Sequence, residues 1–242
     1  MPKPILNVIN ISKEYNNLRV LDNVTFEVRG SEIVGLLGPN GAGKTTTISI
    51  ILGVLEKTSG KVFISDIDID THRSLALANT NFTASYAPLP GNLTVYENLT
   101  VFALLYGVKD YKARISELME RLKIQALRNT KYGALSSGEQ SKINIAKALL
   151  NKPKLLLLDE PTSSLDPATA RDIRNLIKEY AIETDCGVLW TSHNMYEVES
   201  VCDRVLLLSN GRIVLEGNPR ELPKYYDKES LEELFIHKMF EG

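Results

Sequence analysis

The chain has 242 residues, of which 43% are hydrophobic and 24% charged, with a net charge of −2 at pH 7. This composition is typical of a globular protein with one large α/β domain, and the small net charge argues against a general nucleic-acid-binding surface. No run of about 18 apolar residues is present, and the first four residues lack the apolar core of a secretory signal. Cys186 and Cys202 have neither metal-site nor disulfide-framework spacing. We therefore expect a cytoplasmic protein.

The first segments have the alternation of half-buried strands. Apolar and polar residues alternate in Ile5–Ile11 and in Asp22–Val28, which predicts two antiparallel strands. Tyr15 lies between them and has two open interpretations. Its ring either stacks on an adenine base or packs on the hairpin.

A glycine-rich loop follows. Residues 38–46, G-P-N-G-A-G-K-T-T, match the phosphate-binding pattern G-x-x-x-x-G-K-[ST], between a predicted buried strand at 32–37 and a predicted helix at 45–52. Such a loop points several N–H groups and a helix N-terminus at one anion, which predicts a nucleoside triphosphate site. The Lys44 ammonium would reach the β- and γ-phosphates, and the Thr45 hydroxyl would bind Mg²⁺. The candidate nucleotide-binding residues are Gly38, Pro39, Asn40, Gly41, Ala42, Gly43, Lys44, Thr45 and Thr46.

Helical patterns dominate the middle of the chain, after expected strands at 60–64 and 67–69 and a short helix at 74–79. Apolar residues recur at helical spacing in Val95–Tyr106 and in Tyr111–Leu122, which predicts two amphipathic helices. These helices lie between the phosphate loop and the next apolar strand. We therefore expect a helical insert that forms a second lobe.

A Ser-Ser-Gly turn then opens a further helix, in the sequence L-S-S-G-E-Q at residues 135–140. The turn has two interpretations of equal weight. It is either an anion site at a helix N-terminus or an ordinary N-cap.

Two carboxylates end the next apolar strand. Four consecutive leucines, residues 155–158, suit a parallel strand that is covered on both faces, and Asp159 and Glu160 follow them. Open α/β sheets bind ligands at the carboxyl ends of their strands. We therefore expect Asp159 to hold Mg²⁺ and Glu160 to orient and deprotonate an attacking water. The alternative is a solvated strand end.

The last third of the chain continues the alternation of helices and strands. We expect a helix at Ala168–Tyr180 and a buried strand at Gly187–Thr191, which runs into His193. This histidine is either structural or a contact of the γ-phosphate. Asn210-Gly211 predicts a hairpin turn between strands, and residues 228–240 predict a last amphipathic helix.

In this order the motifs resemble those of the nucleotide-binding subunit of an ATP-binding-cassette (ABC) transporter, over residues 5–218. Residues 38–46 match the Walker A loop, 155–160 the Walker B strand, 135–140 the signature, 164–166 the D-loop, His193 the switch histidine and Tyr15 the adenine-stacking aromatic. In the tail, residues 218–222 and 230–235 are similar to the ends of cassette subunits in bacterial and archaeal exporters of the multidrug, antibiotic or sodium type. The alternative for the tail is a generic terminal helix.

The resemblance implies an α/β fold, with a P-loop NTPase (RecA-like) core, an N-terminal antiparallel β subdomain and an inserted α-helical subdomain. One ABC ATPase domain would span residues 1–242. Its β/RecA-like catalytic lobe would comprise residues 1–84 and 152–220, its helical lobe with the signature residues 88–151, and its C-terminal helical tail residues 221–242.

The resemblance also implies a function. The chain would bind and hydrolyse ATP with Mg²⁺ and power transport, with export preferred, through a separate transmembrane subunit. The chain itself would be a cytoplasmic protein bound peripherally at the inner face of the cell membrane. Two cassettes, this chain with a second copy or a paralogue, would face head to tail and sandwich each ATP. Lys44, Glu160 and His193 would be catalytic. The signature and D-loop residues expected to complete the partner's ATP site are Ser136, Ser137, Gly138, Glu139 and Asp166.

Two departures from the family pattern matter. Alignment puts Ser85 where a Q-loop glutamine normally touches Mg²⁺ and the attacking water, and the shorter serine side chain reaches them only through an extra water. Ser85 therefore stays a candidate ligand of both nucleotide and metal. The signature reads Ser-Ser-Gly-Glu instead of Ser-Gly-Gly-Gln, and Glu139 is still expected to accept a hydrogen bond from ribose. We predict an active but slow ATPase, or a heterodimer in which one site is weak.

Two other functions fit the sequence less well. A soluble cassette ATPase that acts on ribosomes or DNA would be expected to carry two cassettes, or coiled-coil or basic insertions, whereas this chain has one cassette, no heptad run and no basic block. A nucleotide kinase would leave the signature at residues 135–140 without a role. The sequence therefore favours a transporter subunit and no nucleic-acid partner.

Overall fold

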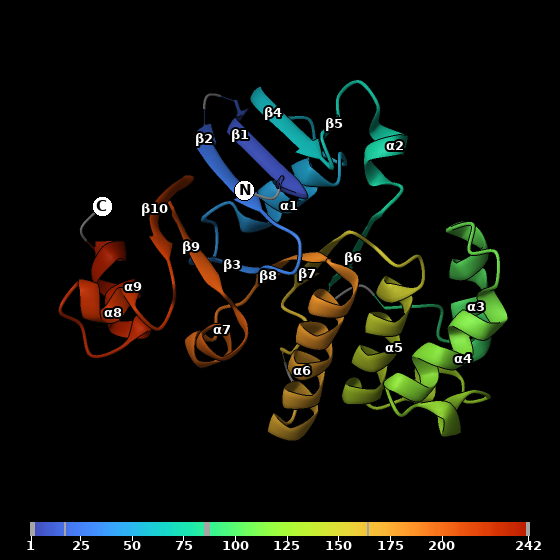
Figure 1. The fold of residues 1–242 in the computed structure, drawn as a ribbon. Coiled ribbons are helices and arrows are strands. Elements are labelled where there is room, and N and C mark those ends of the chain that lie inside the picture. The colour runs from blue at the N-terminus through green and yellow to red at the C-terminus, as the bar shows by residue number, and fades with distance from the viewer. Residues whose placement is uncertain (1–2, 17, 85–87, 164, 241–242) are drawn as a thin grey trace.

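The computed structural model describes residues 3–16, 18–84, 88–163 and 165–240, whose strands form two sheets. The first is antiparallel, four-stranded and ordered β2-β1-β4-β5 (Figure 1). Its strands are β1 (Leu6–Tyr15), β2 (Leu18–Val28), β4 (Ser59–Ile64) and β5 (Ile67–Asp68). Alternation of buried and accessible residues along β1 and β2 fits a sheet with one face on the core.

The second sheet carries the candidate site. It is six-stranded and ordered β10-β9-β3-β8-β7-β6, with β10 antiparallel to β9 and the other pairs parallel. Its strands are β3 (Ile33–Leu37), β6 (Thr80–Ala84), β7 (Leu155–Asp159), β8 (Gly187–Thr191), β9 (Arg204–Ser209) and β10 (Arg212–Gly217). Every residue of β3, β7 and β8 is buried, as expected for parallel strands that are covered on both faces.

Two hydrophobic cores lie on opposite faces of this sheet. Leu155 and Leu157 of β7 pack into the core shared with α1 and the antiparallel sheet, whereas Leu156 and Leu158 pack into the core shared with α5 and α6. Successive side chains of a strand point to opposite faces, so the unbroken run of leucines serves both cores. The helices are α1 (Lys44–Ile51), α2 (Arg73–Leu77), α3 (Val95–Leu105), α4 (Tyr111–Arg121), α5 (Ser137–Leu149), α6 (Pro167–Thr184), α7 (Met195–Val201), α8 (Leu222–Tyr225) and α9 (Leu231–Phe240).

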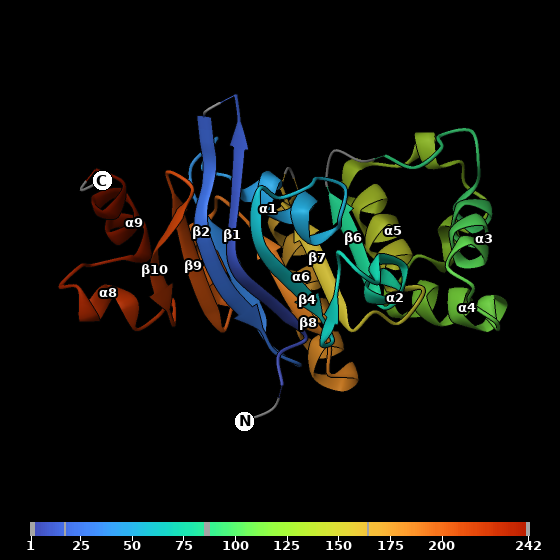
Figure 2. The same cartoon turned by 90° about the horizontal axis from the view of Figure 1, so that it is seen from above.

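Helices α3, α4 and α5 contact one another, and two 3₁₀ turns, Gln125–Leu127 and Tyr132–Ala134, connect α4 to α5. A capping box between Thr94 and Glu97 starts α3. In Figure 2, α3 and α4 lie at one end of the molecule, and α8 and α9 lie at the other. Within the described ranges, no helix is long and apolar enough to cross a bilayer.

The main elements predicted from sequence are present, with some differences. The Asn-Gly hairpin is confirmed, with Asn210 at φ 47° and Gly211 at φ 75°. The first strand runs on to Tyr15, because it pairs with β2 down to the turn. The helix expected to end at Tyr180 continues to Thr184, and the last helix begins at Leu231, with α8 as a separate turn before it. Strand β6 and helix α7 were not predicted.

Candidate functional site

The glycine-rich loop joins β3 to α1, as the sequence predicted. Gly41 and Gly43 have φ values of 82° and 108°, in a region that glycine tolerates far better than other residues. Gly43 is the N-cap of α1, and a Cβ atom there would lie 2.5 Å from Cδ2 of Leu21. Both the backbone conformation and the packing therefore require glycine at position 43.

The loop and the two carboxylates line one cavity of about 350 Å³. Strands β3 and β7 are parallel, with β8 between them, so their carboxyl ends meet at one edge of the sheet. The lining residues are Val20, Asn40, Gly41, Gly43, Lys44, Thr45, Thr46, Asp159 and Glu160. Gly38, Pro39 and Ala42 belong to the same loop but not to this lining. The structure thus brings together the residues predicted to bind phosphate and those predicted to do chemistry.

The half-buried Lys44 side chain folds back across the loop. Its Nζ atom donates hydrogen bonds to the carbonyl oxygens of Gly38, at 2.6 Å, and Pro39, at 3.0 Å. Burial lowers the pKa of Lys44 below its ordinary value, and the negative charges of Glu160 and Asp159 counteract part of this shift. A desolvated cation beside a loop of N–H groups is suited to bind phosphate oxygens.

The two acidic residues are hydrogen-bonded to the neighbouring strand β8, Asp159 through its carboxylate and Glu160 through its backbone N–H. Asp159 is only 6% exposed and accepts a hydrogen bond of 2.6 Å from the hydroxyl of Thr191. Glu160 has φ 53°, and its N–H donates to the hydroxyl oxygen of Thr191, at 3.1 Å, and to the Thr191 carbonyl, at 3.2 Å. Sequence reasoning missed Thr191. Its only signal was its place at the end of a buried strand, two residues before His193.

The histidine and the second carboxylate meet in space. Nδ1 of His193 lies 2.8 Å from a carboxylate oxygen of Glu160, although the two residues are 33 positions apart in the chain. The imidazole is 73% exposed and Glu160 is 23% exposed, so a substrate has access to both. This contact favours the functional interpretation of His193 over a structural one.

The donor set fits Mg²⁺. Within the described part of the chain, no group of three or more His, Cys, Asp or Glu side chains could hold a metal by itself. The cavity offers instead the Asp159 carboxylate and the Thr45 hydroxyl, both oxygen donors. Mg²⁺ typically takes one or two protein oxygens and completes its shell with substrate phosphates and water.

A second cavity, of about 450 Å³, shares Glu160 with the first and is lined by His193 and by the segment that leads into α6. Asp166 is not among the lining residues of this cavity. It is the N-cap of α6, because its carboxylate accepts hydrogen bonds of 3.0 Å from the N–H groups of Ala168 and Thr169. A hydrogen bond from the Thr169 side chain is the main cause of the lowered pKa of Asp166, and these backbone N–H bonds add to it. Ser164 lies outside the described residues.

The signature turn forms a capping box at the start of α5. The Ser136 hydroxyl accepts a hydrogen bond of 3.4 Å from the N–H of Glu139. In return the Glu139 carboxylate accepts hydrogen bonds of 2.8 Å from the N–H and from the hydroxyl of Ser136. The Ser136 backbone bond is the main cause of the lowered pKa of Glu139. Ser137 and Gly138 form the first turn of α5, and none of these four residues lines the phosphate-loop cavity. The capping is thus observed, and phosphate or ribose binding by the signature stays a prediction.

Tyr15 and Ser85 are the two remaining candidate residues for nucleotide binding. Tyr15 ends β1 and is 44% exposed, with Nζ of Lys13 4.7 Å from its ring centroid. It is not among the residues that line the phosphate-loop cavity, so both interpretations of its ring stay open. Ser85, the residue at the Q-loop position, lies outside the described residues.

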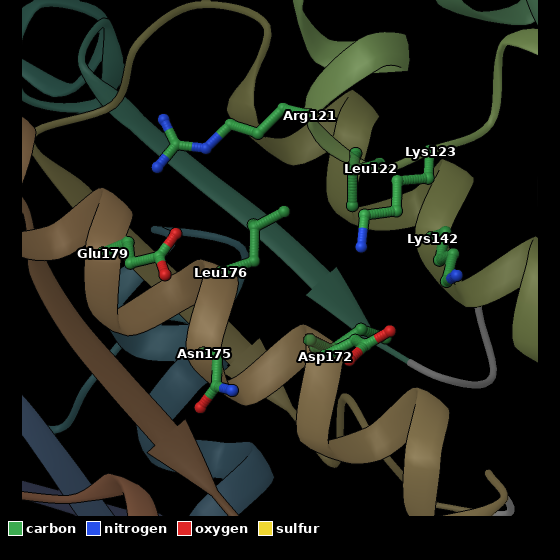
Figure 3. Close-up of a pocket in the computed structure, with 9 residues that line it drawn as sticks. Arg121, Leu122, Lys123, Lys142, Asp172, Asn175, Leu176 and Glu179 are labelled. Atoms are coloured by element: carbon green, nitrogen blue, oxygen red, sulfur yellow. The ribbon is translucent and has the colours of Figure 1, made fainter.

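A smaller pocket, of about 250 Å³, lies between α4, α5 and α6 (Figure 3). Its basic side chains come from the α4 end and α5, and its acidic ones from α6. They are Arg121, Lys123, Lys142, Asp172 and Glu179. Charges of opposite sign therefore face each other where the helical insert meets α6. The pocket shares no lining residue with the two cavities above.

The sequence profile of the ABC transporter family matches residues 21–163, more than half of the chain. The chain belongs to the ABC transporter family. The lipopolysaccharide export system ATP-binding protein LptB of Escherichia coli K12 is 38% identical over 224 residues, which cover 90% of this chain and 92% of LptB.

Solved structures of the family agree with this assignment. The ATP-binding subunit of an ABC transporter superposes with a TM-score of 0.88 at 29% identity, over 97% of this chain and 99% of that one. An ATP-binding cassette solved as a dimer in a post-hydrolysis state with ADP and phosphate gives a TM-score of 0.77 at 25% identity, over 88% and 98% of the two chains. The predicted family, α/β P-loop NTPase fold and ATPase class are thereby confirmed. The chain is an ATP-binding subunit of an ABC transporter.

Proposed function

We propose that this subunit hydrolyses ATP with Mg²⁺ to drive export through a separate transmembrane subunit, at the inner face of the cell membrane. The observation that carries the proposal is the convergence of the phosphate loop, Asp159 and Glu160 on one cavity, with His193 2.8 Å from Glu160. The likeness to LptB, which belongs to an export system, supports the direction of transport.

Each side chain has a proposed role. The loop N–H groups and the Lys44 ammonium bind the β- and γ-phosphates, and Asp159 and Thr45 supply oxygen ligands for Mg²⁺. Bound Mg²⁺ neutralises phosphate charge during phosphoryl transfer. The Glu160 carboxylate accepts a proton from the attacking water, and His193 orients that carboxylate through the 2.8 Å contact.

We further propose a head-to-tail dimer with a second copy or a paralogue. Ser136 and Gly138 do not line the phosphate-loop cavity of their own chain, which supports a role in the site of a partner. A related cassette forms a dimer in its post-hydrolysis state. In this proposal Asp166 and Glu139 also face the partner's ATP, and Tyr15 and Ser85 contact the nucleotide bound to their own chain.

The proposed division into lobes follows from the same mode of action. Residues 88–151, which include α3, α4 and α5, would move as a helical lobe against a catalytic lobe of residues 1–84 and 152–220. Opposite charges face each other between α4–α5 and α6, where such a movement would occur (Figure 3). The tail, residues 221–242, would remain with the catalytic lobe, since α9 contacts α7.

The test compares the wild-type chain with Glu160→Gln in an assay of phosphate release with Mg²⁺ and ATP. We expect slow turnover by the wild type and none above background by Glu160→Gln, because the glutamine amide cannot accept the proton of the attacking water. Both chains should bind ATP equally, because the amide keeps the shape of the carboxylate. Glu232→Gln, at an exposed position in α9, is the matched control. Wild-type turnover no higher than that of Glu160→Gln would contradict the proposal.

A second experiment tests the partner. The tagged Glu160→Gln chain is recovered from native membranes in mild detergent with Mg²⁺ and ATP, because this variant should hold the closed dimer. Co-purification of a polytopic membrane protein is the expected result, and its identity would narrow the cargo. Recovery of ribosomal or DNA-associated partners, with the chain absent from membranes, would refute the transport role.

A further inference from the structure

Thr191 occupies a position between the two halves of the ATPase site. It is the last residue of β8, the strand that lies between β3, which leads into the phosphate loop, and β7, which ends at Asp159. Its side chain is 0% exposed. We propose that Thr191 is a positioning residue that sets the geometry of both Asp159 and Glu160, an inference that rests on the proposed ATPase function.

The hydroxyl of Thr191 is used in both directions. The hydroxyl donates a hydrogen bond of 2.6 Å to Oδ1 of Asp159, and its oxygen accepts a hydrogen bond of 3.1 Å from the N–H of Glu160. A hydroxyl has one donor and two acceptor lone pairs, so one group serves both neighbours at once. Valine has nearly the same shape but can make neither bond, which makes it the discriminating substitution.

The bond to Asp159 has a specific consequence. Asp159 is 6% exposed, and burial of a carboxylate costs free energy unless hydrogen-bond donors pair with its oxygens. A short bond from a hydroxyl to an ionised carboxylate is among the stronger hydrogen bonds in proteins. It restricts rotation of the carboxylate at the edge of the cavity, and therefore the direction in which Asp159 presents oxygen to a divalent cation.

The bond to Glu160 supports an unfavourable backbone. Glu160 has φ 53°, which non-glycine residues seldom adopt, so surrounding contacts have to hold it. Thr191 binds its N–H, while the N–H and hydroxyl of Ser163 donate to its carbonyl, at 3.1 and 2.9 Å. Fixed on both sides, the backbone directs the Glu160 carboxylate towards His193.

The test uses the full chain with Thr191→Val, Thr191→Ser and a matched control, Thr80→Val. Thr80 is also a buried threonine in a strand of this sheet, but it begins β6 beside Leu155, at the end of the sheet away from the cavity. Calorimetry measures ATP affinity with EDTA and with Mg²⁺, which gives a readout apart from turnover. Phosphate release gives kcat and KM, and thermal melting by circular dichroism checks the fold.

We expect Thr191→Val to bind ATP in EDTA as the wild type does, to lose most of the affinity that Mg²⁺ adds, and to lower kcat about tenfold or more, the effect of one charge-assisted hydrogen bond. Thr191→Ser should restore both values, and Thr80→Val should behave as the wild type. If Thr191→Val melts below the assay temperature, all variants are measured at a temperature below its melting point, with the same expectation.

Wild-type kcat together with a wild-type effect of Mg²⁺ in Thr191→Val would overturn the inference. So would equal losses in Thr191→Val and Thr191→Ser, since serine keeps the hydroxyl. If the wild type itself shows no turnover above Glu160→Gln, the proposed ATPase role fails. The Mg²⁺-dependent affinity of Thr191→Val then still decides whether Thr191 positions Asp159.

Discussion

Substitution of Gly43 by alanine tests whether the phosphate loop requires glycine for the reasons that the structure gives. Gly43 has φ 108° and ψ 6° at the N-cap of α1. A Cβ atom there would lie 2.5 Å from Cδ2 of Leu21 and 3.2 Å from the carbonyl oxygen of Val20. Leu21 is 0% exposed, so its side chain has little room to move away.

The cost has two parts. The left-handed backbone costs an alanine about 1–2 kcal/mol relative to glycine. Overpacking against a buried leucine adds about 1–3 kcal/mol, so the free energy of unfolding should fall by about 2–5 kcal/mol. Gly107→Ala is the matched control, because Gly107 also has positive φ, 68°, but a Cβ atom added there would meet nothing within 4 Å. It should lose only the backbone part, about 1–2 kcal/mol.

Urea unfolding followed by circular dichroism measures both variants, and titration with a fluorescent ATP analogue measures nucleotide affinity. Gly43→Ala should also bind ATP at least about tenfold more weakly, since a shifted loop loses one or more N–H contacts with phosphate. Gly107→Ala should bind ATP as the wild type does. Equal losses of stability in the two variants, or wild-type ATP affinity in Gly43→Ala, would refute this account of the loop.

Three other predictions follow from burial and charge. Because burial depresses the pKa of Lys44 below its ordinary 10.5, its ammonium is lost at a lower pH than in the unfolded chain. Stability should therefore rise with pH between the pKa of Lys44 in the folded chain and its pKa in the unfolded chain. ATP affinity should fall over the same pH range, and Lys44→Arg should remove this fall in affinity, measured by titration with labelled nucleotide. Leu234→Ala, at a fully buried position in α9, should cost about 2–5 kcal/mol in urea unfolding. Ile236→Ala, at a position that is 48% exposed, should change stability by less than about 1 kcal/mol. A loss in Leu234→Ala as small as that in Ile236→Ala would show that α9 does not belong to the core. Glu183→Gln removes the charge of a partly exposed ion pair of 2.7 Å with Arg121, so it should cost less than about 1 kcal/mol in urea unfolding, and a larger loss would contradict the weak contribution expected of an exposed pair.

Local patterns predicted the elements that carry a strong signal. The unbroken leucines of β7 and the Asn-Gly turn between β9 and β10 were identified because adjacent residues specify them. Strand β6 was missed because T-N-F-T-A contains no clear apolar run, and it is a strand through its pairing with β7. Helix α7 has only seven residues, and the Asn194 cap that starts it gives a weak signal within so short a segment.

By itself the sequence determined which chemical groups this protein offers: a loop with the phosphate-binding pattern, two carboxylates at a strand end, a histidine and a signature turn, each specified by residues adjacent in the chain. The tertiary structure decided which of these meet. Strand β8 lies between β3 and β7, an order that no local pattern encodes, because sheet order depends on packing between distant segments. This order places Thr191 against the Asp159 carboxylate and the Glu160 backbone N–H, and His193 against the Glu160 carboxylate. It also leaves the signature outside the cavity that the phosphate loop lines.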